Sequence, residues 1–217
     1  MPNPALVMLG GARHATSVYN VARSAGYEIA HIVDPGKRGT RLYDVEILGA
    51  VEEIDTPERF HFCIAVGDNQ RREIIHEDLR RLIPTAIFPA LVHASAVTSV
   101  GTSIGEGTIV MPAAVIGPSS IIGRFCILNT RCSIDHDGRM QDYSSLAPGV
   151  TVGGCVRIGA RSAICIGATI KDGVQVGDDS VVGANSYLSR DLPDNKVAYG
   201  TPAKVVRSRA RDEPYLK

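Results

Sequence analysis

Large aliphatic side chains recur at every sixth position through the second half of this chain. The series runs from Ile104 to Val182 without a break. With 44% of all residues hydrophobic, such a run arises by chance on the order of once in 100,000 trials, so a fixed structural repeat explains it better. A β-sandwich would instead alternate every two residues and turn irregularly. The series is Ile104, Val110, Ile116, Ile122, Leu128, Ile134, Met140, Leu146, Val152, Ile158, Ile164, Ile170, Val176 and Val182.

Two companion patterns indicate how each six-residue unit bends. The residue four places after each aliphatic is small or modest in size, as at Thr108, Ala114 and Ser120. Glycine often follows the aliphatic directly, where we expect a tight corner that favours a residue without a Cβ. Three such units then make one triangular coil, and stacked coils bury the aliphatic series along one axis. The predicted corner glycines are Gly105, Gly117, Gly123, Gly153, Gly159, Gly177 and Gly183.

Residues 1 to about 90 follow a different pattern, in which short apolar runs alternate with amphipathic segments. The first run stops at Gly10 and Gly11, as a buried parallel strand entering a glycine turn does. This alternation predicts a Rossmann-like α/β domain. The predicted strands are 5–9, 28–33 and 62–66, and the predicted helices are 15–25 and 69–82. The apolar side chains expected on the second helix are Ile74, Ile75, Leu79 and Leu82.

We therefore predict three segments along the chain. Residues 1–90 form the Rossmann-like domain, residues 91–207 form a parallel β-helix, and residues 208–217 form a C-terminal tail. Ligands of open α/β sheets bind where the strands end, so the first domain is expected to bind a substrate. The tail has mixed charge and little apolar content, and its sequence predicts no function.

Charge and composition argue against several classes of protein. The 23 basic residues balance the 23 acidic ones, so no nucleic acid partner is expected. No stretch approaches the roughly 18 apolar residues of a membrane span and no basic leader is present, which predicts a cytoplasmic protein. The five cysteines lack CxxC spacing and the six histidines are scattered, so we expect structural thiols and no metal site.

Three motifs resemble a known family. The hexads, the segment LNTRCSIDHDGRMQDYSSLAPGV (128–150) and the segment AYGTPAKVVR (198–207) are similar to those of hexapeptide acyltransferases. The N-terminal GGARHA narrows the resemblance to two-domain sugar acetyltransferases, which include sialic acid O-acetyltransferases and N-acetyltransferases of nucleotide-linked 4-amino-4,6-dideoxy sugars. The resemblance implies a left-handed β-helix, acetyl-CoA as co-substrate, and a homotrimer with active sites between subunits.

His136 is the candidate catalytic base. It follows Ile134 by two positions, so it lies at a corner of the coil and projects away from the aliphatic axis. Acyl transfer to an amine needs a base, and imidazole titrates near neutral pH. The resemblance gives His136 this role and gives Asp137 the role of orienting the ring. No Cys or Ser is expected beside His136 in an arrangement that resembles an activated nucleophile, so we expect direct transfer without an acyl-enzyme. The alternative is a surface histidine at a turn.

Acetyl-CoA is expected to lie along the outside of the rod. A step of three six-residue units places Gly154 beside His136 on the next coil, with its backbone amide open to a ligand. By resemblance, the amides of Gly154 and Ile166 contact the pantetheine arm, and Ala184 lies in a stretch near the adenine. Many relatives carry a second histidine nine residues after the first, where this chain has Ser145. Its hydroxyl could donate one hydrogen bond to the acetyl carbonyl.

The first domain is expected to bind the other substrate. A glycine turn before a helix offers free amides and a favourable dipole to phosphate, and Asp34 lies near the spacing at which an acid meets a ribose. Arg13 stands where the family usually has glycine and could add a charged donor. By resemblance, His14 reaches a neighbouring subunit's active site and touches the sugar. The alternative is a purely structural cap. The predicted substrate-binding residues are Gly10, Gly11, Arg13, His14, Asp34, Lys37, Gly67, Asp68 and Asn69.

These observations lead to one function and two competitors. The first is acetylation of the amine of a nucleotide-linked 4-amino-4,6-dideoxy sugar, with surface glycan or lipopolysaccharide synthesis as the family's usual setting. The second is O-acetylation of a sialic acid or related sugar. The third, of another class, is a non-catalytic trimeric scaffold that binds a nucleotide. The sequence leaves open whether the nucleotide is UDP, GDP or dTDP, and which sugar it carries.

Overall fold

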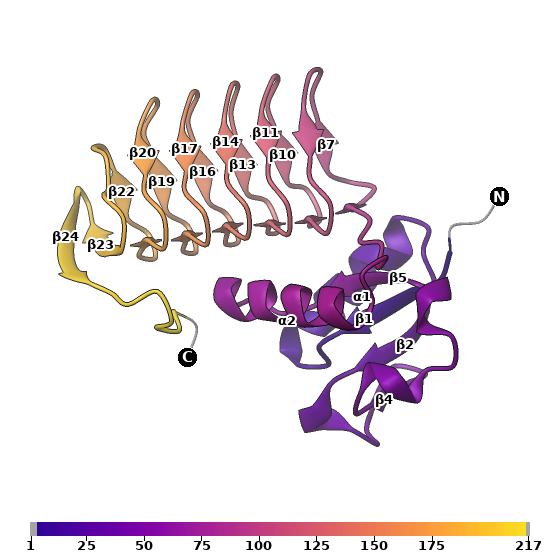
Figure 1. Cartoon of the computed structure of the whole chain (residues 1–217). Helices are drawn as coiled ribbons and strands as arrows, with labels where there is room; N and C mark the ends of the chain where they lie inside the picture. The colour runs from indigo at the N-terminus through magenta and orange to yellow at the C-terminus, as the bar shows by residue number, and fades with distance from the viewer. Residues whose placement is uncertain (1–3, 216–217) are drawn as a thin grey trace.

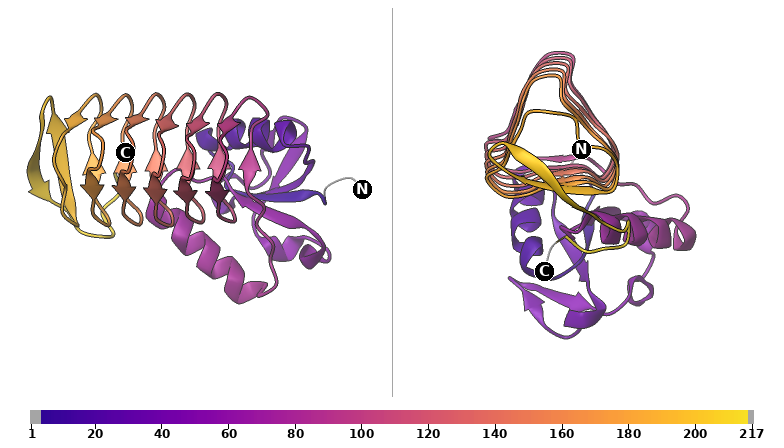
Figure 2. Two further views of the ribbon diagram at one scale, coloured as in Figure 1. Left: turned by 90° about the horizontal axis from the view of Figure 1, so that it is seen from above. Right: turned by 90° about the vertical axis from the view of Figure 1, so that its left-hand side faces the viewer.

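The computed structural model of the protein describes residues 4–215. The ends of the predicted first domain and tail, residues 1–3 and 216–217, lie outside the described residues. An α/β domain is followed by a left-handed parallel β-helix, as the sequence predicts. Figure 1 shows the coils stacked in a row, with α2 (Asn69–Leu82) running beside one face of the stack. Viewed along the rod in Figure 2, each coil is a triangle.

The α/β domain is built on a five-stranded sheet with the order β3-β4-β2-β1-β5. Strands β1, β2, β4 and β5 are parallel, and β3 is an antiparallel edge strand. The strands are β1 (Leu6–Leu9), β2 (Ile29–Val33), β3 (Arg41–Leu42), β4 (Val45–Leu48) and β5 (His61–Ile64). The helices are α1 (Arg13–Ser24), α2, and the 3₁₀ turns η1 (Pro35–Lys37), η2 (Val51–Glu53) and η3 (Pro57–Arg59).

The predicted elements of this domain are confirmed, with small differences at their ends. The second helix has the predicted bounds, whereas α1 begins two residues before the predicted position. The predicted apolar face of α2 is wrong in part, because the side chains of Ile74 and Leu82 are about half exposed. The fully buried side chain of α2 is instead that of Arg72, which no apolar pattern reveals. The sequence interpretation also missed the strands β3 and β4.

Arg72 holds the α/β domain against the β-helix. Its five N–H donors all have acceptors, so the buried charge is hydrogen-bonded throughout. Two acceptors, the carbonyls of Phe125 and Tyr143, lie on the β-helix at 2.7 and 2.8 Å. The others are the carbonyls of Val66 and Gly67 and the side-chain oxygen of Asn69. The loop after β5 is therefore fixed relative to the rod.

The β-helix is made of two-residue strands on three faces. Each strand pairs in parallel with the strand three six-residue units further on, as Ile116 pairs with Ile134. The first face holds β6 (Leu91–Val92), β9 (Ile109–Val110), β12 (Ile127–Leu128), β15 (Ser145–Leu146), β18 (Ala163–Ile164) and β21 (Val181–Val182). The second holds β7 (Val97–Thr98), β10 (Val115–Ile116), β13 (Ser133–Ile134), β16 (Thr151–Val152), β19 (Thr169–Ile170) and β22 (Tyr187–Leu188). The third holds β8 (Ser103–Ile104), β11 (Ile121–Ile122), β14 (Arg139–Met140), β17 (Arg157–Ile158) and β20 (Gln175–Val176).

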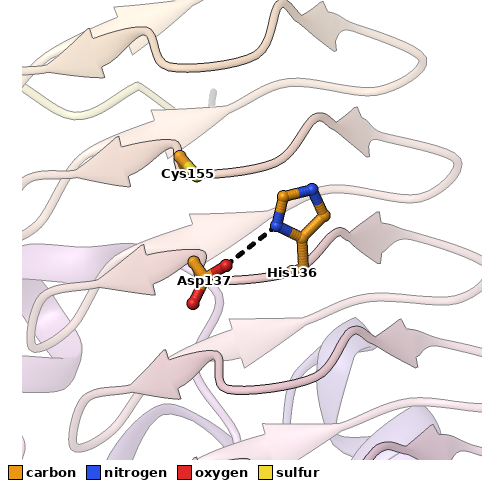
Figure 3. Close-up of side chains that lie close together, drawn as sticks. All are labelled: His136, Asp137 and Cys155. Carbon is orange, nitrogen blue, oxygen red and sulfur yellow. Dashed lines mark hydrogen bonds and ion pairs between the residues drawn. The ribbon is translucent and has the colours of Figure 1, made fainter.

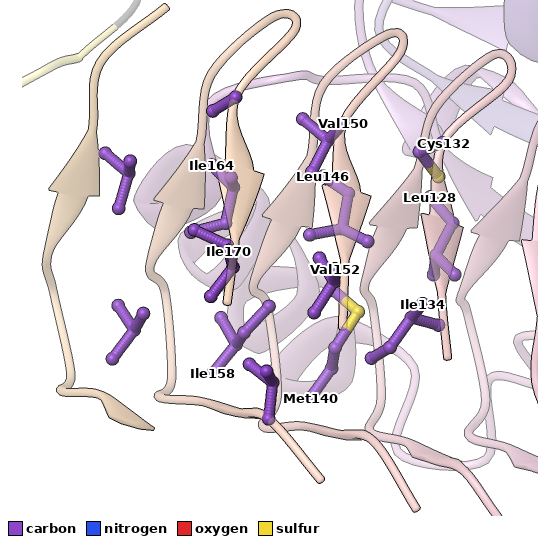
Figure 4. Close-up of a cluster of buried hydrophobic side chains, with 14 of the residues drawn as sticks. Leu128, Cys132, Ile134, Met140, Leu146, Val150, Val152, Ile158, Ile164 and Ile170 are labelled. Carbon is purple, nitrogen blue, oxygen red and sulfur yellow. The ribbon is translucent and has the colours of Figure 1, made fainter. Parts of the chain in front are cut away.

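The aliphatic series lines the inside of the rod, as predicted (Figure 4). From Val110 to Val182 every member is buried, and Ile104 packs against the same cluster at its open end. The companion positions are buried as well, and those that carry hydroxyls bond to the backbone. Ser120, for example, donates to the carbonyl of Asp135 at 2.8 Å. Small polar residues at these positions therefore satisfy backbone groups inside each corner.

The predicted role of the corner glycines is wrong. The left-handed backbone that turns each corner lies two residues later, and it recurs every six residues from Gly101 to Asn185 with φ between 53° and 75°. The glycines after the aliphatic residues instead permit close stacking of coils. A Cβ on Gly117 would lie 2.7 Å from the carbonyl carbon of Asp135 on the next coil. Such a corner therefore needs a left-handed residue to turn the chain and, two positions earlier, a small residue that lets the next coil approach.

Two longer strands end the rod. They are β23 (Lys196–Gly200), which continues the first face, and the antiparallel β24 (Ala203–Ser208). After β24 the chain turns back toward the α/β domain (Figure 1). In the described part of the chain, no helix combines the length and apolar character that crossing a membrane requires.

Candidate active site

His136 and Asp137 lie on an outer corner of the rod, between β13 and β14 (Figure 3). The His136 side chain is 53% exposed, and its Nδ1 lies 2.9 Å from Oδ2 of Asp137. A carboxylate only accepts, so Nδ1 carries the proton and Nε2 is left as an acceptor. The hydrogen bond that His136 donates to Asp137 raises the pKa of the imidazole above its ordinary value. The pair therefore has the arrangement of a base and its orienting acid.

Gly154 lies directly against the His136 ring on the next coil. A Cβ at this position would be 2.5 Å from Nε2, so only glycine leaves the ring its present place. The prediction that the Gly154 amide is open to a ligand is wrong for this structure, because that amide donates to Oδ1 of Asp172 at 2.9 Å. Gly154 thus shapes the space around the imidazole.

Cys155 is a neighbour of this pair that the sequence interpretation did not identify. It stacks above Asp137, one coil further along, and it is exposed. Its Sγ, a ring nitrogen of His136 and an oxygen of Asp137 all lie within 4.8 Å of one another. These are donor types that transition metals accept, although the sequence predicted no metal site. Of the other thiols, Cys63, Cys126 and Cys132 are buried and Cys165 is partly buried.

A second candidate region is a cavity of about 600 Å³ at the carboxyl ends of β1, β2 and β5. Six of the predicted substrate-binding residues line it together: Gly10, His14, Asp34, Lys37, Gly67 and Asp68. An apolar cavity of about 440 Å³ adjoins it and shares Gly10, Asp34, Val66 and Arg71. The two cavities form one joint space, and aliphatic side chains such as Leu9, Val51 and Leu79 line its smaller part.

The amides of the two glycines in the turn are already bonded, so neither is free for phosphate. The Gly10 amide donates to the carbonyl of Val33, and the Gly11 amide donates to Oδ2 of Asp34, both at 2.8 Å. The other oxygen of Asp34 accepts from the Gly36 amide at 3.0 Å. Asp34 therefore fixes the turn while its carboxylate still borders the cavity.

His14 borders the same cavity with an unsatisfied nitrogen. Its Nε2 is buried and has no hydrogen-bond partner among the described residues. Burial, with a smaller contribution from the charge of Arg72, lowers the pKa of His14 to about 4. A neutral imidazole with an unpaired nitrogen beside a cavity can hydrogen-bond a ligand hydroxyl.

Three predicted substrate-binding residues do not line this cavity: Gly11, Arg13 and Asn69. Asn69 is buried against the β-helix, where its side-chain amide donates to the carbonyls of Arg161 and Ser162 at 3.0 and 3.1 Å. Arg13 is exposed at the start of α1. Asn69 therefore serves the contact between the two parts of the chain.

The predicted acetyl-CoA residues lie apart from one another in the single chain. Ser145 begins β15 on the first face, which is opposite the corner that carries His136. It is 7% exposed, and its hydroxyl lies 3.2 Å from that of Tyr215. Ile166 and Ala184 lie at the corner between the first and second faces, and both are exposed. Within one chain, the predicted acetyl-CoA residues therefore do not form a single cluster.

Sequence reasoning missed several residues of the larger cavity, among them Gln70, Arg71, Asp212 and Pro214. Gln70 and Arg71 follow the predicted strand end directly, so position along the chain could have indicated them. Asp212 and Pro214 come from the C-terminal tail, and no local signal in the sequence connects them with residues near position 70.

Comparison with known families and curated relatives points to acetyl transfer. The family described as PglD N-terminal domain matches residues 5–79. The galactoside O-acetyltransferase of Escherichia coli is 40% identical over 67 residues, which is 30% of this chain and 30% of that protein. This chain thus spans about a third of the length of such curated relatives.

Two solved structures match over nearly the whole chain. A histidine-to-alanine variant of GDP-perosamine N-acetyl transferase from Caulobacter crescentus, in complex with CoA and GDP-perosamine, is 32% identical with a TM-score of 0.87. The match covers 94% of this chain and 97% of that one. The acetyltransferase domain of PglB from Neisseria gonorrhoeae, in complex with acetyl coenzyme A, is 30% identical with a TM-score of 0.86, over 94% and 100% of the chains.

Proposed function

Because this chain belongs to the hexapeptide-repeat sugar acetyltransferases, which take their acetyl group from acetyl-CoA, we propose that it acetylates the amine of a nucleotide-linked 4-amino-4,6-dideoxy sugar. The observation that carries the proposal is the exposed His136–Asp137 pair on an outer corner, with Nε2 of His136 beside Gly154. The solved relative in complex with GDP-perosamine supports this substrate class.

The proposed reaction is a direct transfer in which His136 handles one proton. The sugar amine attacks the thioester carbonyl carbon of acetyl-CoA, and Nε2 of His136 takes the proton that the nitrogen sheds. Asp137 stabilises the imidazolium through Nδ1. The tetrahedral intermediate then expels the CoA sulfur, which receives the proton from the imidazolium. The products are an amide and free CoA thiol.

The cavity of the α/β domain is the proposed site of the nucleotide sugar. Lys37 and Arg71 supply positive charge for the diphosphate. The carboxylate of Asp34, which already accepts two backbone amides, has lone pairs left for a ribose hydroxyl. The unpaired Nε2 of His14 would bond a hydroxyl of the sugar. The adjoining apolar cavity suits the base.

A homotrimer would bring the separate parts together. His136 lies on the corner opposite the face that carries Ser145, and that face packs against the α/β domain. A second subunit that placed its His136 corner beside this cavity would complete the site, and acetyl-CoA would lie between the two rods. The arrangement of residues in one chain thus favours active sites shared between subunits.

Replacing His136 with Asn tests the proposal. We expect turnover to fall by about 100-fold or more while acetyl-CoA still binds, because the base is lost and the corner keeps its shape. The assay is release of free thiol from acetyl-CoA with GDP-, UDP- and dTDP-linked 4-amino-4,6-dideoxy sugars. The matched control is His93→Asn, since the described hydrogen bonds of the His93 side chain are all to Ser95.

The same assay, with free sialic acid added as an acceptor, separates the competing functions. Near-normal turnover by the His136→Asn variant would refute the role of this residue. Acetylation of free sialic acid, but of no nucleotide amino sugar, would instead support an O-acetyltransferase. Nucleotide binding without thiol release from any acceptor would favour the non-catalytic scaffold.

A further inference from the structure

The residues after β24 cross from the end of the rod to the α/β domain. We name residues 209–215 the C-terminal strap. Arg209 donates to the carbonyl of Asp179 on the rod at 2.7 Å, and Arg211 forms an ion pair with Glu73 of α2 at 3.0 Å. Glu213 pairs with Arg207 of β24 at 2.7 Å. The strap is therefore attached to both parts of the protein.

Tyr215 fixes the last described residue of the strap between the two parts. Its hydroxyl donates to the carbonyl of Gly67 at 2.9 Å and lies 3.2 Å from the hydroxyl of Ser145. A phenol has one proton to donate, so Ser145 is the donor in the second bond. Burial raises the pKa of Tyr215 above its ordinary value, which keeps the phenol protonated. The one proton of Ser145 is therefore used, although the sequence assigned it to the acetyl carbonyl.

The strap also borders the cavity proposed for the nucleotide sugar. Asp212 and Pro214 line this cavity opposite residues of the α/β domain, which include His14 and Lys37. Gly67, whose carbonyl Tyr215 holds, lines it too. The strap thus supplies two wall residues and, together with Arg72, fixes a third. Because Asp212 is an acid, it can accept hydrogen bonds from ligand hydroxyls, whereas it would repel phosphate.

We propose that the C-terminal strap is part of the substrate site and determines which nucleotide sugar binds. Asp212 accepts a hydrogen bond from a hydroxyl of the bound nucleotide sugar, and Tyr215 holds the strap and the Gly67 carbonyl in position for this contact. The proposal rests on the proposed function, since it assigns the cavity to the sugar nucleotide. It gives a role to a segment whose sequence predicted none.

The test compares Asp212→Asn and Tyr215→Phe in the full chain. We expect the KM for the nucleotide amino sugar to rise about tenfold in each, because a hydrogen bond involving a charged group or fixing one is lost. The KM for acetyl-CoA should stay within about twofold. Matched controls are Asp55→Asn and Tyr43→Phe, which alter exposed residues outside this cavity. Thermal unfolding of each variant shows whether it folds.

Binding without acetyl-CoA separates this proposal from the proposed function. The affinity of GDP-, UDP- and dTDP-linked 4-amino-4,6-dideoxyglucose is measured by calorimetry on the wild-type protein and the variants. Weaker binding by Asp212→Asn and Tyr215→Phe supports the strap even if no sugar is acetylated. Equal affinities, with or without a lower unfolding temperature, would limit the strap to a structural role and overturn the proposal. Absence of binding to the wild-type protein would overturn both proposals.

Discussion

His136 and Asp137 are adjacent in sequence, and the corner of the coil makes them a pair in space. Neighbouring side chains on a strand point to opposite faces, so such a pair could not form there. Asp137 has a φ of 57°, a left-handed conformation that aspartate tolerates better than most residues. The backbone turn thereby directs the carboxylate toward Nδ1 of the ring, 2.9 Å away.

The effect of Asp137 on the base predicts a shift in the pH profile. The Asp137 hydrogen bond raises the pKa of His136, and only the neutral ring can accept a proton. Turnover should therefore fall as the pH drops through this raised pKa. In Asp137→Asn the pKa should return toward 6.5, so the acid limb of kcat/KM should move to lower pH while the maximum rate falls. An acid limb at an unchanged pH would show that another group controls it.

Single residues differ in how well the sequence predicted them. His136, Asp34 and His14 could be found because a motif or a strand end marks them. Arg72 could not, because a charged residue among Arg, Glu and Asp looks like part of an exposed face. Its burial depends on acceptors that the β-helix supplies, such as the carbonyls of Phe125 and Tyr143. The role of Arg72 in joining the α/β domain to the β-helix is therefore seen only in the folded chain.

At the scale of the element, the coil was predictable because each of its three sides needs a large aliphatic side chain on the axis of the rod. One large aliphatic residue per side fills the axis, and this alone specified the register from Ile104 to Val182. The corner was predicted less well, because close stacking of coils and the left-handed turn act on two different residues, two positions apart. Close stacking selects glycine at Gly117, whereas the left-handed turn accepts residues as different as Ser119 and Phe125. The sequence therefore reveals the stacking position through its glycines, whereas the left-handed position has no characteristic residue type.

The stacking of coils gives a prediction for Gly154. In Gly154→Ala the new Cβ would lie 2.5 Å from Nε2 of His136, so the exposed ring must move aside. Moving an exposed ring costs little, so the unfolding temperature should change by only about 2 °C or less. Turnover should fall by about tenfold or more, because the base leaves its productive position.

Cys155 provides the control for this variant, because Cys155→Ala removes atoms from the same corner. Under direct transfer, Cys155→Ala should keep normal turnover. A large loss in Cys155→Ala would implicate the thiol in the reaction. Normal turnover in Gly154→Ala would mean that the ring does not need its present position.

At the scale of the whole molecule, the two predicted functional regions of one chain face different directions. The cavity lies between the α/β domain and the C-terminal strap, and His136 lies on the corner opposite the first face of the rod. Sequence motifs identified both regions but not their separation, because local patterns carry no information on how distant segments pack. The strap was missed for the same reason, since Tyr215 and Gly67 are 148 residues apart.

Active sites shared between subunits predict complementation. The variants His136→Asn and His14→Ala impair different parts of the proposed site. When the two are co-expressed, mixed trimers should contain sites in which both parts are intact, roughly a quarter of all sites if assembly is random. Thiol release should then exceed that of either variant alone. No recovery in isolated mixed trimers would place the whole site within one subunit.

The constant coil length has a consequence for how such a protein can change over time. Adding or deleting three six-residue units inserts or removes one complete coil. All remaining side chains then stay on the same face of the rod. The separation between the imidazole and the capping hairpin of β23 and β24 can therefore vary only in discrete increments of about 4.8 Å, the spacing of paired strands. The distance along the outside of the rod therefore changes in steps of one coil, and relatives of different length should differ by whole coils.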